Sequence, residues 1–266
     1  MINKKSIALV AGLMLIILIP SLLFGCAPKG GAEQPSDRSL GDVKQRGKLV
    51  VGTSTNYKPM EFYGDNNELV GLDMDIAKEI ASQLDISLEM KDYLWNELLD
   101  AASSGEIDFA ISSMTITPER SQKMLFSSPY FNGGQVIVVR SDTENILSPD
   151  DLIDKKVAAG AGTTSEKAAL EYVQPSAILN IDDYGPELTV LLNGTVDAVI
   201  IDYVAAVDYV KISSDKLKIV GEPFSQEYYG IATKLGNNAL MDEINRILRD
   251  MKRTGKLDEI KNKWLK

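Results

Sequence analysis

The feature that most limits the fold of this chain is an alternation of short apolar runs with helical patterns, which occurs twice. In the first occurrence, strands are expected at 48–52, 87–90 and 107–111, with helices between them at 73–84 and 95–102. The helix at 73–84 is expected because its apolar residues recur three and four positions apart, which places them on one face. Strands that alternate with helices are typical of α/β proteins.

A second occurrence begins after a β-branched run, Gln135–Arg140. After this second series come an extended segment at 229–233, a long amphipathic helix at 239–253 and a short helix that carries Ile260 and Trp264. The strands of this second series are expected at 157–159, 178–181, 198–202 and 217–220, and its helices at 165–172, 186–192 and 203–212.

Two series of this kind indicate two α/β lobes of about ninety residues each, a usual size for a compact unit. We expect the second lobe to be inserted between two extended crossings, near 136–140 and 229–233. The first lobe then covers 45–137 together with the return segment 229–266, and the second lobe covers 138–228.

The first 25 residues are expected to be a signal peptide that is not part of the fold. Lys4 and Lys5 precede an apolar run at 7–19, and small residues follow it. A basic start, an apolar stretch and small residues near the cleavage point are typical of secretory signals. An uncleaved anchor over 7–24 is the alternative, and in both cases the protein is exported and stays tethered.

Cys26 is the only cysteine, so it has no partner within the chain for a disulfide. The run LFGC at 23–26 resembles a bacterial lipobox, which implies cleavage before Cys26 and a diacylglyceryl thioether on its sulfur. A terminus that carries more than one acyl chain is stably bound to a membrane. Residues 26–44 contain many glycine, proline and polar residues, and we expect them to form a flexible tether.

The composition excludes several classes of function. The chain has 28 basic and 38 acidic side chains and a net charge of −10, so its surface repels nucleic acid. It contains no histidine, and its one cysteine lies outside the expected lobes. Zinc sites built on histidine or cysteine, Ser-His-Asp triads and Cys-His pairs are therefore excluded. We expect neither a metal nor a cofactor.

In α/β sheets, ligands bind beyond the carboxyl ends of the strands, so the residues that follow strands form the candidate site. Ser54 and Tyr57 follow the first strand, and the tyrosine ring is placed to cover one face of a ligand. Trp95 begins a helix after the second strand. The alternative for Tyr57 is a turn tyrosine half-packed on its lobe, and the alternative for Trp95 is a place in the core.

The stretch ISSMTITPERSQKMLFSSPYF at 111–131 combines hydroxyl side chains, among them Ser113 and Thr115, with an unexpected arginine. The pair TP at 117–118 predicts a helix start, with threonine as the N-cap and proline at the first helical position. Arg120 then opposes the positive end of the helix dipole, at a cost of about 0.3–1 kcal/mol. A tolerated surface arginine is one explanation, and an anion held jointly by the guanidinium, the hydroxyls and the helix amides is the other.

The second lobe contains two complementary groups. The loop GAGTTS at 160–165, which includes Thr164, places two glycines and three hydroxyls before a helix and can accept an anion. Asp202 stands where a strand ends, where it can hold a cation such as an ammonium or act as the N-cap of the next helix. Carboxylate receptors, a lone carboxylate and nearby aromatic rings are together what an α-amino acid zwitterion needs.

The chain from about Lys48 to Lys266 resembles the family 3 extracellular solute-binding proteins, the polar amino-acid receptors of ABC importers. The resemblance implies a periplasmic-binding-protein type II fold, in which two α/β lobes joined by two hinge strands close over one ligand. The motifs that carry it are GTSTNYKPMEF (52–62), GLDMDIAKEIA (71–81), IDFAISSMTITPERSQKMLFSSPY (107–130), AGTTSE (161–166), VDAVIID (196–202) and YYGIATK (228–234).

The resemblance also implies which residues bind the two charged groups of the ligand. The α-carboxylate is expected on Arg120, Thr115 and the amide of Thr164. The α-ammonium is expected on Asp202, with help from Ser113.

The ligand side chain is expected, by the same resemblance, between Tyr57 and Trp95. Several members that bind cationic ligands have aspartate where this chain has Ser54, which argues against lysine, arginine or histidine as the ligand. Trp95 and Tyr57 could nevertheless hold a guanidinium through cation–π contacts.

The function implied is that of an extracytoplasmic, lipid-anchored, monomeric receptor that binds a polar L-amino acid and delivers it to an ABC-transporter permease. One alternative is an enzyme on the same scaffold, such as a cyclohexadienyl or arogenate-type dehydratase, because a fold does not determine a function. Such an enzyme would have to use Asp, Glu, Lys or Tyr as its acid. The other alternative is a sensory or adhesive lipoprotein that binds an amino acid without serving a transporter.

Overall fold

A computed structural model describes residues 37–182 and 185–265. The expected signal peptide 1–25, the Cys26 lipidation site and most of the tether 26–44 lie outside these residues. Helix α1 (Ser39–Arg46) begins inside the expected tether and buries Val43 against the first lobe. Part of the expected tether is therefore helical, because one of its apolar side chains has a place in the core.

The first lobe is built on a five-stranded sheet with the order β4-β1-β5-β14-β6. β1 pairs in parallel with β4 and β5, whereas β14 is antiparallel to its neighbours β5 and β6. The chain therefore leaves this sheet and re-enters it from the opposite direction. The strands are β1 (Lys48–Thr53), β4 (Ser87–Asp92), β5 (Phe109–Ala110), β6 (Met124–Phe126) and β14 (Ala232–Lys234), and a separate small pair is formed by β2 (Phe62–Tyr63) and β3 (Leu69–Val70).

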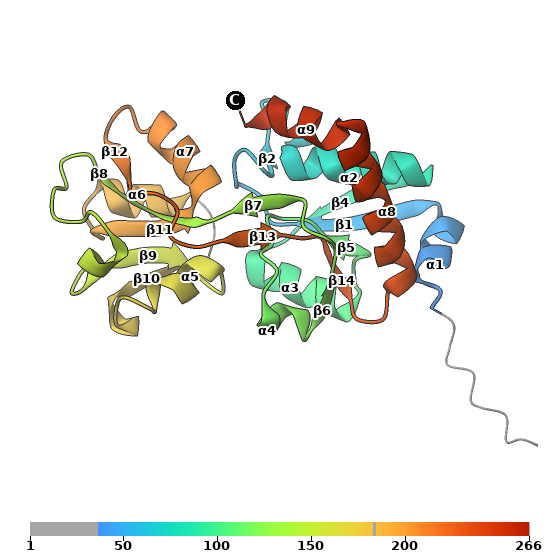
Figure 1. The fold of residues 1–266 in the computed structure, drawn as a ribbon, viewed down its shortest axis with the longest axis horizontal. Helices are drawn as coiled ribbons and strands as arrows, with labels where there is room; N and C mark the ends of the chain where they lie inside the picture. The colour runs from blue at the N-terminus through green and yellow to red at the C-terminus, as the bar shows by residue number, and fades with distance from the viewer. Residues whose placement is uncertain (1–36, 183–184, 266) are drawn as a thin grey trace, which may run out of the picture. The chain divides into compact units, whose positions relative to one another are not determined.

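Helices cover both faces of this sheet (Figure 1). α2, α8 and α9 pack together through their apolar stripes. The spacing of apolar residues at 73–84 and 239–253 predicts such a stripe on α2 and on α8. α3 packs on the opposite face, where Trp95 and Leu98 belong to a separate apolar cluster. The remaining bounds are α2 (Leu72–Leu84), α3 (Trp95–Ser104), α4 (Pro118–Ser121), α8 (Asn238–Thr254) and α9 (Lys256–Trp264).

The second lobe has its own five-stranded sheet, with the order β10-β9-β11-β8-β12. β9 is parallel to β10 and β11, and β8 runs antiparallel between β11 and β12. The elements are β8 (Gln135–Arg140), β9 (Val157–Gly160), β10 (Ile178–Ile181), β11 (Ala198–Asp202), β12 (Leu217–Val220), α5 (Thr164–Ala169), α6 (Pro186–Leu192), α7 (Tyr203–Ile212) and two 3₁₀ turns, η1 (Pro149–Leu152) and η2 (Pro175–Ala177).

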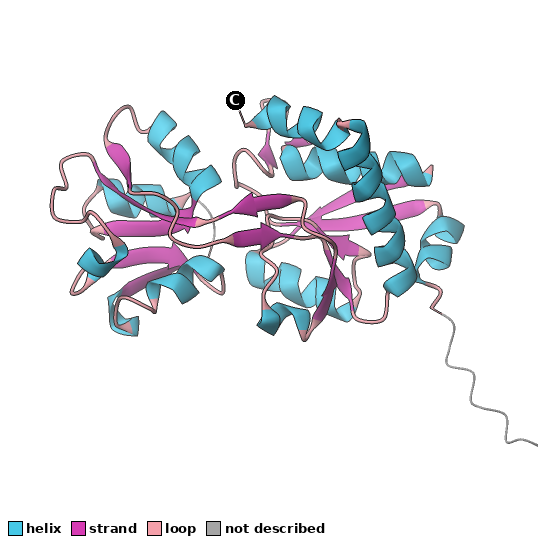
Figure 2. Ribbon diagram, in the orientation of Figure 1, coloured by secondary structure: helices cyan, strands magenta, loops and turns pink. Residues whose placement is uncertain are grey.

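Two strands join the lobes side by side, β7 (Phe131–Gly133) and β13 (Glu227–Tyr229), which form an antiparallel ribbon (Figure 2). The two α/β lobes and the two connecting strands are confirmed. The first crossing is displaced from its expected place near 136–140, because those residues belong to β8. The run QVIVVR is buried between two neighbouring strands, and its β-branched side chains are better accommodated there than in an exposed connection.

Candidate functional site

The predicted site residues lie in loops, at strand ends and in the first turns of helices, where the two lobes meet. Side-chain hydrogen bonds cross from one lobe to the other at this interface, so the structure is that of a closed form. The first lobe supplies Ser54, Tyr57, Trp95, Ser113, Thr115 and Arg120, and the second lobe supplies Thr164 and Asp202.

Tyr57 and Asp202 contact each other directly across the lobes. The Tyr57 hydroxyl donates to Oδ2 of Asp202, and both side chains are buried. Asp202 is at the N-cap position of α7, but its side chain makes no capping hydrogen bond. Its Oδ1 instead accepts a hydrogen bond from Nε2 of Gln135 at 2.6 Å. The carboxylate therefore faces the other lobe and does not cap its own helix.

Burial raises the pKa of the Asp202 carboxyl to about 7, and the nearby carboxylate of Glu227 adds to this rise. Hydrogen bonds from the hydroxyls of Tyr57 and Tyr229 and the positive charge of Arg120 act in the opposite direction and lower this pKa. Asp202 is therefore a carboxylate that lacks full compensation by positive charge, and a cation placed beside it would be stabilised.

Arg120 follows a helix start of the predicted kind. Thr117 is the N-cap of α4, and its hydroxyl accepts a hydrogen bond from the Arg120 amide at 3.2 Å. The guanidinium donates to the carbonyl of Thr115 in its own lobe at 3.0 Å and to the carbonyl of Gly162 in the second lobe at 3.3 Å. Arg120 is only partly buried, and its charge acts on Asp202, so both groups belong to one interface.

Trp95 combines the two roles that its position in the sequence leaves open. Its ring is buried in the apolar cluster around α3, and its indole N–H donates to the carbonyl of Gly162 at 3.1 Å. The Arg120 guanidinium lies 4.9 Å from the centre of the same ring, within cation–π range. The carbonyl of Gly162 thus accepts from two side chains of the other lobe.

Glycine suits this contact for two physical reasons. The φ of Gly162, +72°, lies in the left-handed region, and an added Cβ would overlap the exposed side chain of Asn96 unless that side chain rotated away. The glycine in the loop GAGTTS therefore allows the two lobes to approach closely.

Two buried side chains of the site were missed by the sequence analysis, Gln135 and Glu227. Glu227 Oε2 accepts hydrogen bonds from the hydroxyls of Thr115 at 2.6 Å and Thr164 at 2.7 Å, one from each lobe. Its Oε1 accepts from Nε2 of Gln135 at 3.0 Å. Gln135 begins β8, and Glu227 begins β13, two residues before the extended segment expected at 229–233. The sequence feature that could have identified Gln135 and Glu227 is a polar side chain at the end of an extended segment.

Ser54 and Ser113 are held by hydrogen bonds from their backbone amides to side chains of the first lobe. The Ser54 amide donates to the hydroxyl of Ser112 at 3.0 Å, and the Ser113 amide donates to Asp73 at 2.7 Å. Ser113 has a φ of +47°, which is uncommon for a residue other than glycine. These two serines are thus held in place by groups of their own lobe. The other predicted side chains of the first lobe contact the second lobe or β13.

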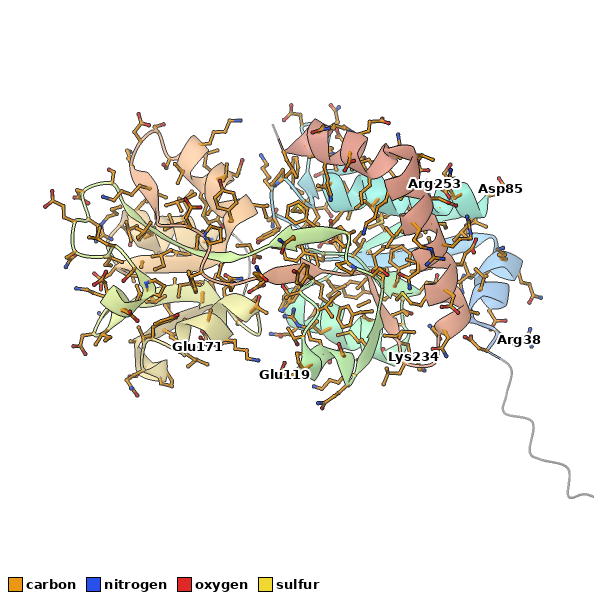
Figure 3. All side chains as sticks on the ribbon, in the orientation of Figure 1. Arg38, Asp85, Glu119, Glu171, Lys234 and Arg253 are labelled. Carbon is orange, nitrogen blue, oxygen red and sulfur yellow. The ribbon has the colours of Figure 1, made fainter. Side chains whose placement is uncertain are left out.

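An exposed ion pair lies at the edge of the interface. Nζ of Lys167 in the second lobe is 2.8 Å from Oε1 of Glu119, a residue labelled in Figure 3 at the margin of the first lobe. The hydrogen bond from Lys167 lowers the pKa of Glu119 to about 2. Beside this pair is a cavity of about 580 Å³, whose lining includes Asn96, Arg120, Gly162 and Thr164.

Within 37–182 and 185–265, no three side chains of the metal-binding types are grouped closely enough to hold a metal ion. The helices in this part of the chain are all too short or too polar to cross a bilayer.

Two α/β lobes, a pair of connecting strands and a buried polar interface between the lobes define a two-lobed solute-binding protein. The model of the bacterial extracellular solute-binding proteins, family 3, matches residues 49–266. The chain therefore belongs to this family, whose members are extracytoplasmic, and the expected fold class is confirmed.

Relatives of known name agree with this assignment. The L-cystine-binding protein TcyJ of Escherichia coli is 33% identical over 249 residues, which cover 93% of this chain and 92% of TcyJ. The structure of an ancestral arginine-binding protein bound to arginine has a TM-score of 0.79 and 41% identity, covering 83% of this chain and 99% of that one. The ancestral amino acid-binding protein AncCDT-1, a precursor of cyclohexadienyl dehydratase, has a TM-score of 0.80 and 35% identity, covering 86% and 100%.

Proposed function

We propose that this protein is a receptor that binds a polar L-amino acid between its lobes and presents it to an ABC-transporter permease. The observation that carries the proposal is the presence of Arg120 and Asp202, one from each lobe, at the same buried interface. A guanidinium and a carboxylate at one site complement the two charged groups of an amino acid. The family membership and the amino-acid-binding relatives support this function.

In the proposed complex, the ligand carboxylate binds Arg120, Thr115 and the Thr164 amide. The ligand ammonium binds Asp202, with Ser113 nearby. The ligand then replaces some of the hydrogen bonds that the closed form makes between its own groups. The Tyr57 hydroxyl, for example, exchanges its contact with Asp202 for the ligand ammonium.

The ligand side chain lies between Tyr57 and Trp95, beside Ser54. The indole of Trp95 is fixed by its hydrogen bond to Gly162, so it offers a rigid ring face. The relatives differ in the amino acid that their names give, and the aromatic pair is compatible with an aliphatic or a guanidinium group.

Closure of the lobes is the proposed mechanism of recognition. β7 and β13 act as the hinge, because they are the two strands that connect the sheets. A ligand favours the closed form only through contacts that it makes with both lobes, and Arg120 and Asp202 meet this condition. The closed receptor is then the form that the permease recognises.

A thermal-shift screen of the common L-amino acids, with L-cystine included, followed by calorimetry, tests this function. A ligand at a hundred times its dissociation constant should stabilise the protein by about 2.7 kcal/mol. We expect one polar amino acid or a small group of them to give this shift. If no amino acid shifts the unfolding temperature at millimolar concentration, the proposal is wrong.

A dehydratase activity is the second candidate, favoured by one observation. A carboxyl whose pKa is about 7, such as that of Asp202, is suited to act as a general acid near neutral pH. The relation to AncCDT-1 makes this candidate concrete. Incubation with prephenate and arogenate, analysed for aromatic products, distinguishes the two functions, and we expect no turnover.

We further propose that the protein is anchored through a lipid on Cys26 and acts as a monomer. Mass spectrometry of the membrane-extracted protein should show a chain that starts at Cys26 with acyl groups attached, and Cys26→Ala should abolish this modification. Co-purification with a permease distinguishes a transport receptor from a sensory lipoprotein.

A further inference from the structure

Two carboxyl groups, Glu61 and Asp73, are buried together in the first lobe, with 1% and 0% of their surface exposed. Neither forms an ion pair with a lysine or arginine among residues 37–182 and 185–265. A buried carboxylate without a cationic partner is costly, and two of them side by side would also repel each other. The pair therefore needs a proton or strong hydrogen bonds to be stable.

The two oxygens of Asp73 differ in their hydrogen bonds. Oδ2 of Asp73 accepts from the Ser113 amide at 2.7 Å and from the Tyr130 hydroxyl at 2.8 Å. Oδ1 accepts no hydrogen bond from an amide or hydroxyl of the described residues, and the carboxyl of Glu61 is close enough for a hydrogen bond between the two carboxyl groups to affect the pKa of both. Two carboxyl groups can form such a bond only when one is protonated. The two carboxyl groups therefore share one proton between Glu61 and Oδ1 of Asp73, while Oδ2 of Asp73 remains an acceptor.

The same pair contacts both ligand loops of the first lobe. Oε1 of Glu61 accepts from the Ser112 hydroxyl at 2.8 Å, and that hydroxyl oxygen accepts from the Ser54 amide at 3.0 Å. Asp73 holds the amide of Ser113, whose left-handed backbone is unfavourable in a residue other than glycine. Such a conformation persists only where surrounding contacts enforce it.

We propose that Glu61 and Asp73 are positioning residues that share one proton and hold the Ser54 and Ser113 loops in the geometry needed for amino-acid binding. This inference rests on the proposed function, because it concerns the loops of the proposed ligand site. Neither carboxyl touches the ligand in this arrangement, and each acts through a serine.

The electrostatics of the pair agree with a shared proton. Burial raises the pKa of Glu61 well above its usual range, and the neighbouring charge of Asp73 raises it further. Burial also raises the pKa of Asp73 to about 7. The other titratable groups that face the pair are Tyr130 and, beside it, Tyr229; burial raises the pKa of Tyr130 as well, so it remains a neutral donor.

Two substitutions at Glu61 separate positioning from simple core packing. Glu61→Gln keeps an N–H that can donate to Asp73 and an oxygen that can accept from Ser112, so it mimics the protonated acid. Glu61→Met keeps the length but removes both functions and leaves Asp73 and Ser112 unsatisfied. Where these unsatisfied groups loosen the serine loops, binding of the amino acid should weaken by about tenfold to a hundredfold.

We therefore expect Glu61→Gln to bind the amino acid within about threefold of the wild-type affinity at pH 7, and Glu61→Met to bind at least about tenfold more weakly. Glu68, an exposed glutamate a few residues away, provides matched controls, Glu68→Gln and Glu68→Met, which should bind normally. The proposal would be overturned if Glu61→Gln and Glu61→Met lost the same amount of affinity for the amino acid, or if Glu61→Met bound it normally.

The stability of the ligand-free protein tests the shared proton without any ligand. The folded protein keeps a proton that the unfolded chain releases above a pH of about 4, so this contribution to stability is lost as pH rises toward and past 7. Urea unfolding at pH 5 and pH 8 should show a larger loss for the wild type than for Glu61→Gln, which has no proton to release. If the free energy of unfolding falls by the same amount between pH 5 and pH 8 in both proteins, the pair does not share a proton.

These outcomes remain distinct from failure of the proposed function. If the wild type binds no amino acid, the proposed function and the positioning role both fail, and the unfolding comparison still decides whether the pair shares a proton. If Glu61→Met does not fold, the affinity and pH dependence of Glu61→Gln decide the proposal.

Discussion

The hydroxyl of Tyr57 in the first lobe donates a hydrogen bond to the Asp202 carboxylate in the second lobe, although 145 positions separate the two residues in the chain. The same carboxylate accepts from Gln135, and the charge of Arg120 also acts on it. Asp202 therefore interacts with side chains of both lobes. Its protonation should govern ligand binding.

Amino-acid affinity should fall as the pH is lowered below about 7. Asp202 has a pKa of about 7 without ligand, and only the ionised carboxylate can pair with the ligand ammonium. Below this pKa the ligand must displace a proton, which costs up to about tenfold in affinity per pH unit. Calorimetry between pH 5 and 8 measures this slope, and Asp202→Asn should weaken binding and abolish the slope. A wild-type affinity that does not change across this range would contradict the assignment.

Tyr57→Phe should move the midpoint of this pH dependence upward. The Tyr57 hydroxyl lowers the pKa of Asp202 by donating to its charged form, so removal of the hydroxyl raises that pKa. The midpoint is read from the same calorimetric series. Tyr63→Phe is a matched control, because the Tyr63 hydroxyl lies in the first lobe and contacts Asp92. A midpoint that stays in place or moves to lower pH in Tyr57→Phe counts against the contact.

Glu227→Gln should move the midpoint in the opposite direction. The charge of Glu227 raises the pKa of Asp202, so a neutral amide at this position leaves Asp202 ionised at lower pH. The amide oxygen of the substituted side chain can still accept from Thr115 and Thr164, which limits the change in structure. Glu222→Gln, at an exposed site, serves as the control. Opposite shifts in the Tyr57 and Glu227 variants would identify Asp202 as the titrating group.

Arg120→Ala should reduce amino-acid binding by at least about a hundredfold while the fold stays intact. A charge-assisted bond to a ligand carboxylate contributes about 1.5–3 kcal/mol, and a bidentate pair contributes more. Calorimetry measures the affinity, and circular dichroism measures the fold. Lys123→Ala removes the same charge from an exposed position lining the neighbouring cavity and should bind normally. Near-normal affinity in Arg120→Ala would refute the carboxylate assignment.

Gly162→Ala should weaken ligand binding, because its added Cβ would meet the exposed Asn96 side chain, which must rotate away before the lobes can close. Gly236 is the matched control, since it also has a positive φ, +93°, but no atom lies within 4 Å of its added Cβ. Gly236→Ala should lower the stability through backbone strain and leave the affinity unchanged. Small-angle scattering with saturating ligand compares closure in the two variants, and equal closure would show that Gly162 has no role at the contact.

Local features of this protein could be predicted from the sequence because they depend on neighbouring residues. Thr117 caps α4, as the TP pair predicts. The apolar stripe of α8 is buried, and the two strand–helix series form two separate sheets. The positions of Ser54, Tyr57, Thr164 and Asp202 at strand ends and loops follow from the same local reading, and their ligand roles stay predictions.

Only the tertiary structure shows which distant groups share a proton or a hydrogen bond. Glu227 reaches Thr115 across 112 positions of the chain, and Ser112 reaches Glu61 across 51. No local pattern marks such pairs, because the return of the chain to the first sheet and the closure of the lobes bring them together. The sequence by itself therefore determines the elements and the chemistry available at their ends. Topology decides which of these groups meet out of water, where a single charge or proton changes the free energy most.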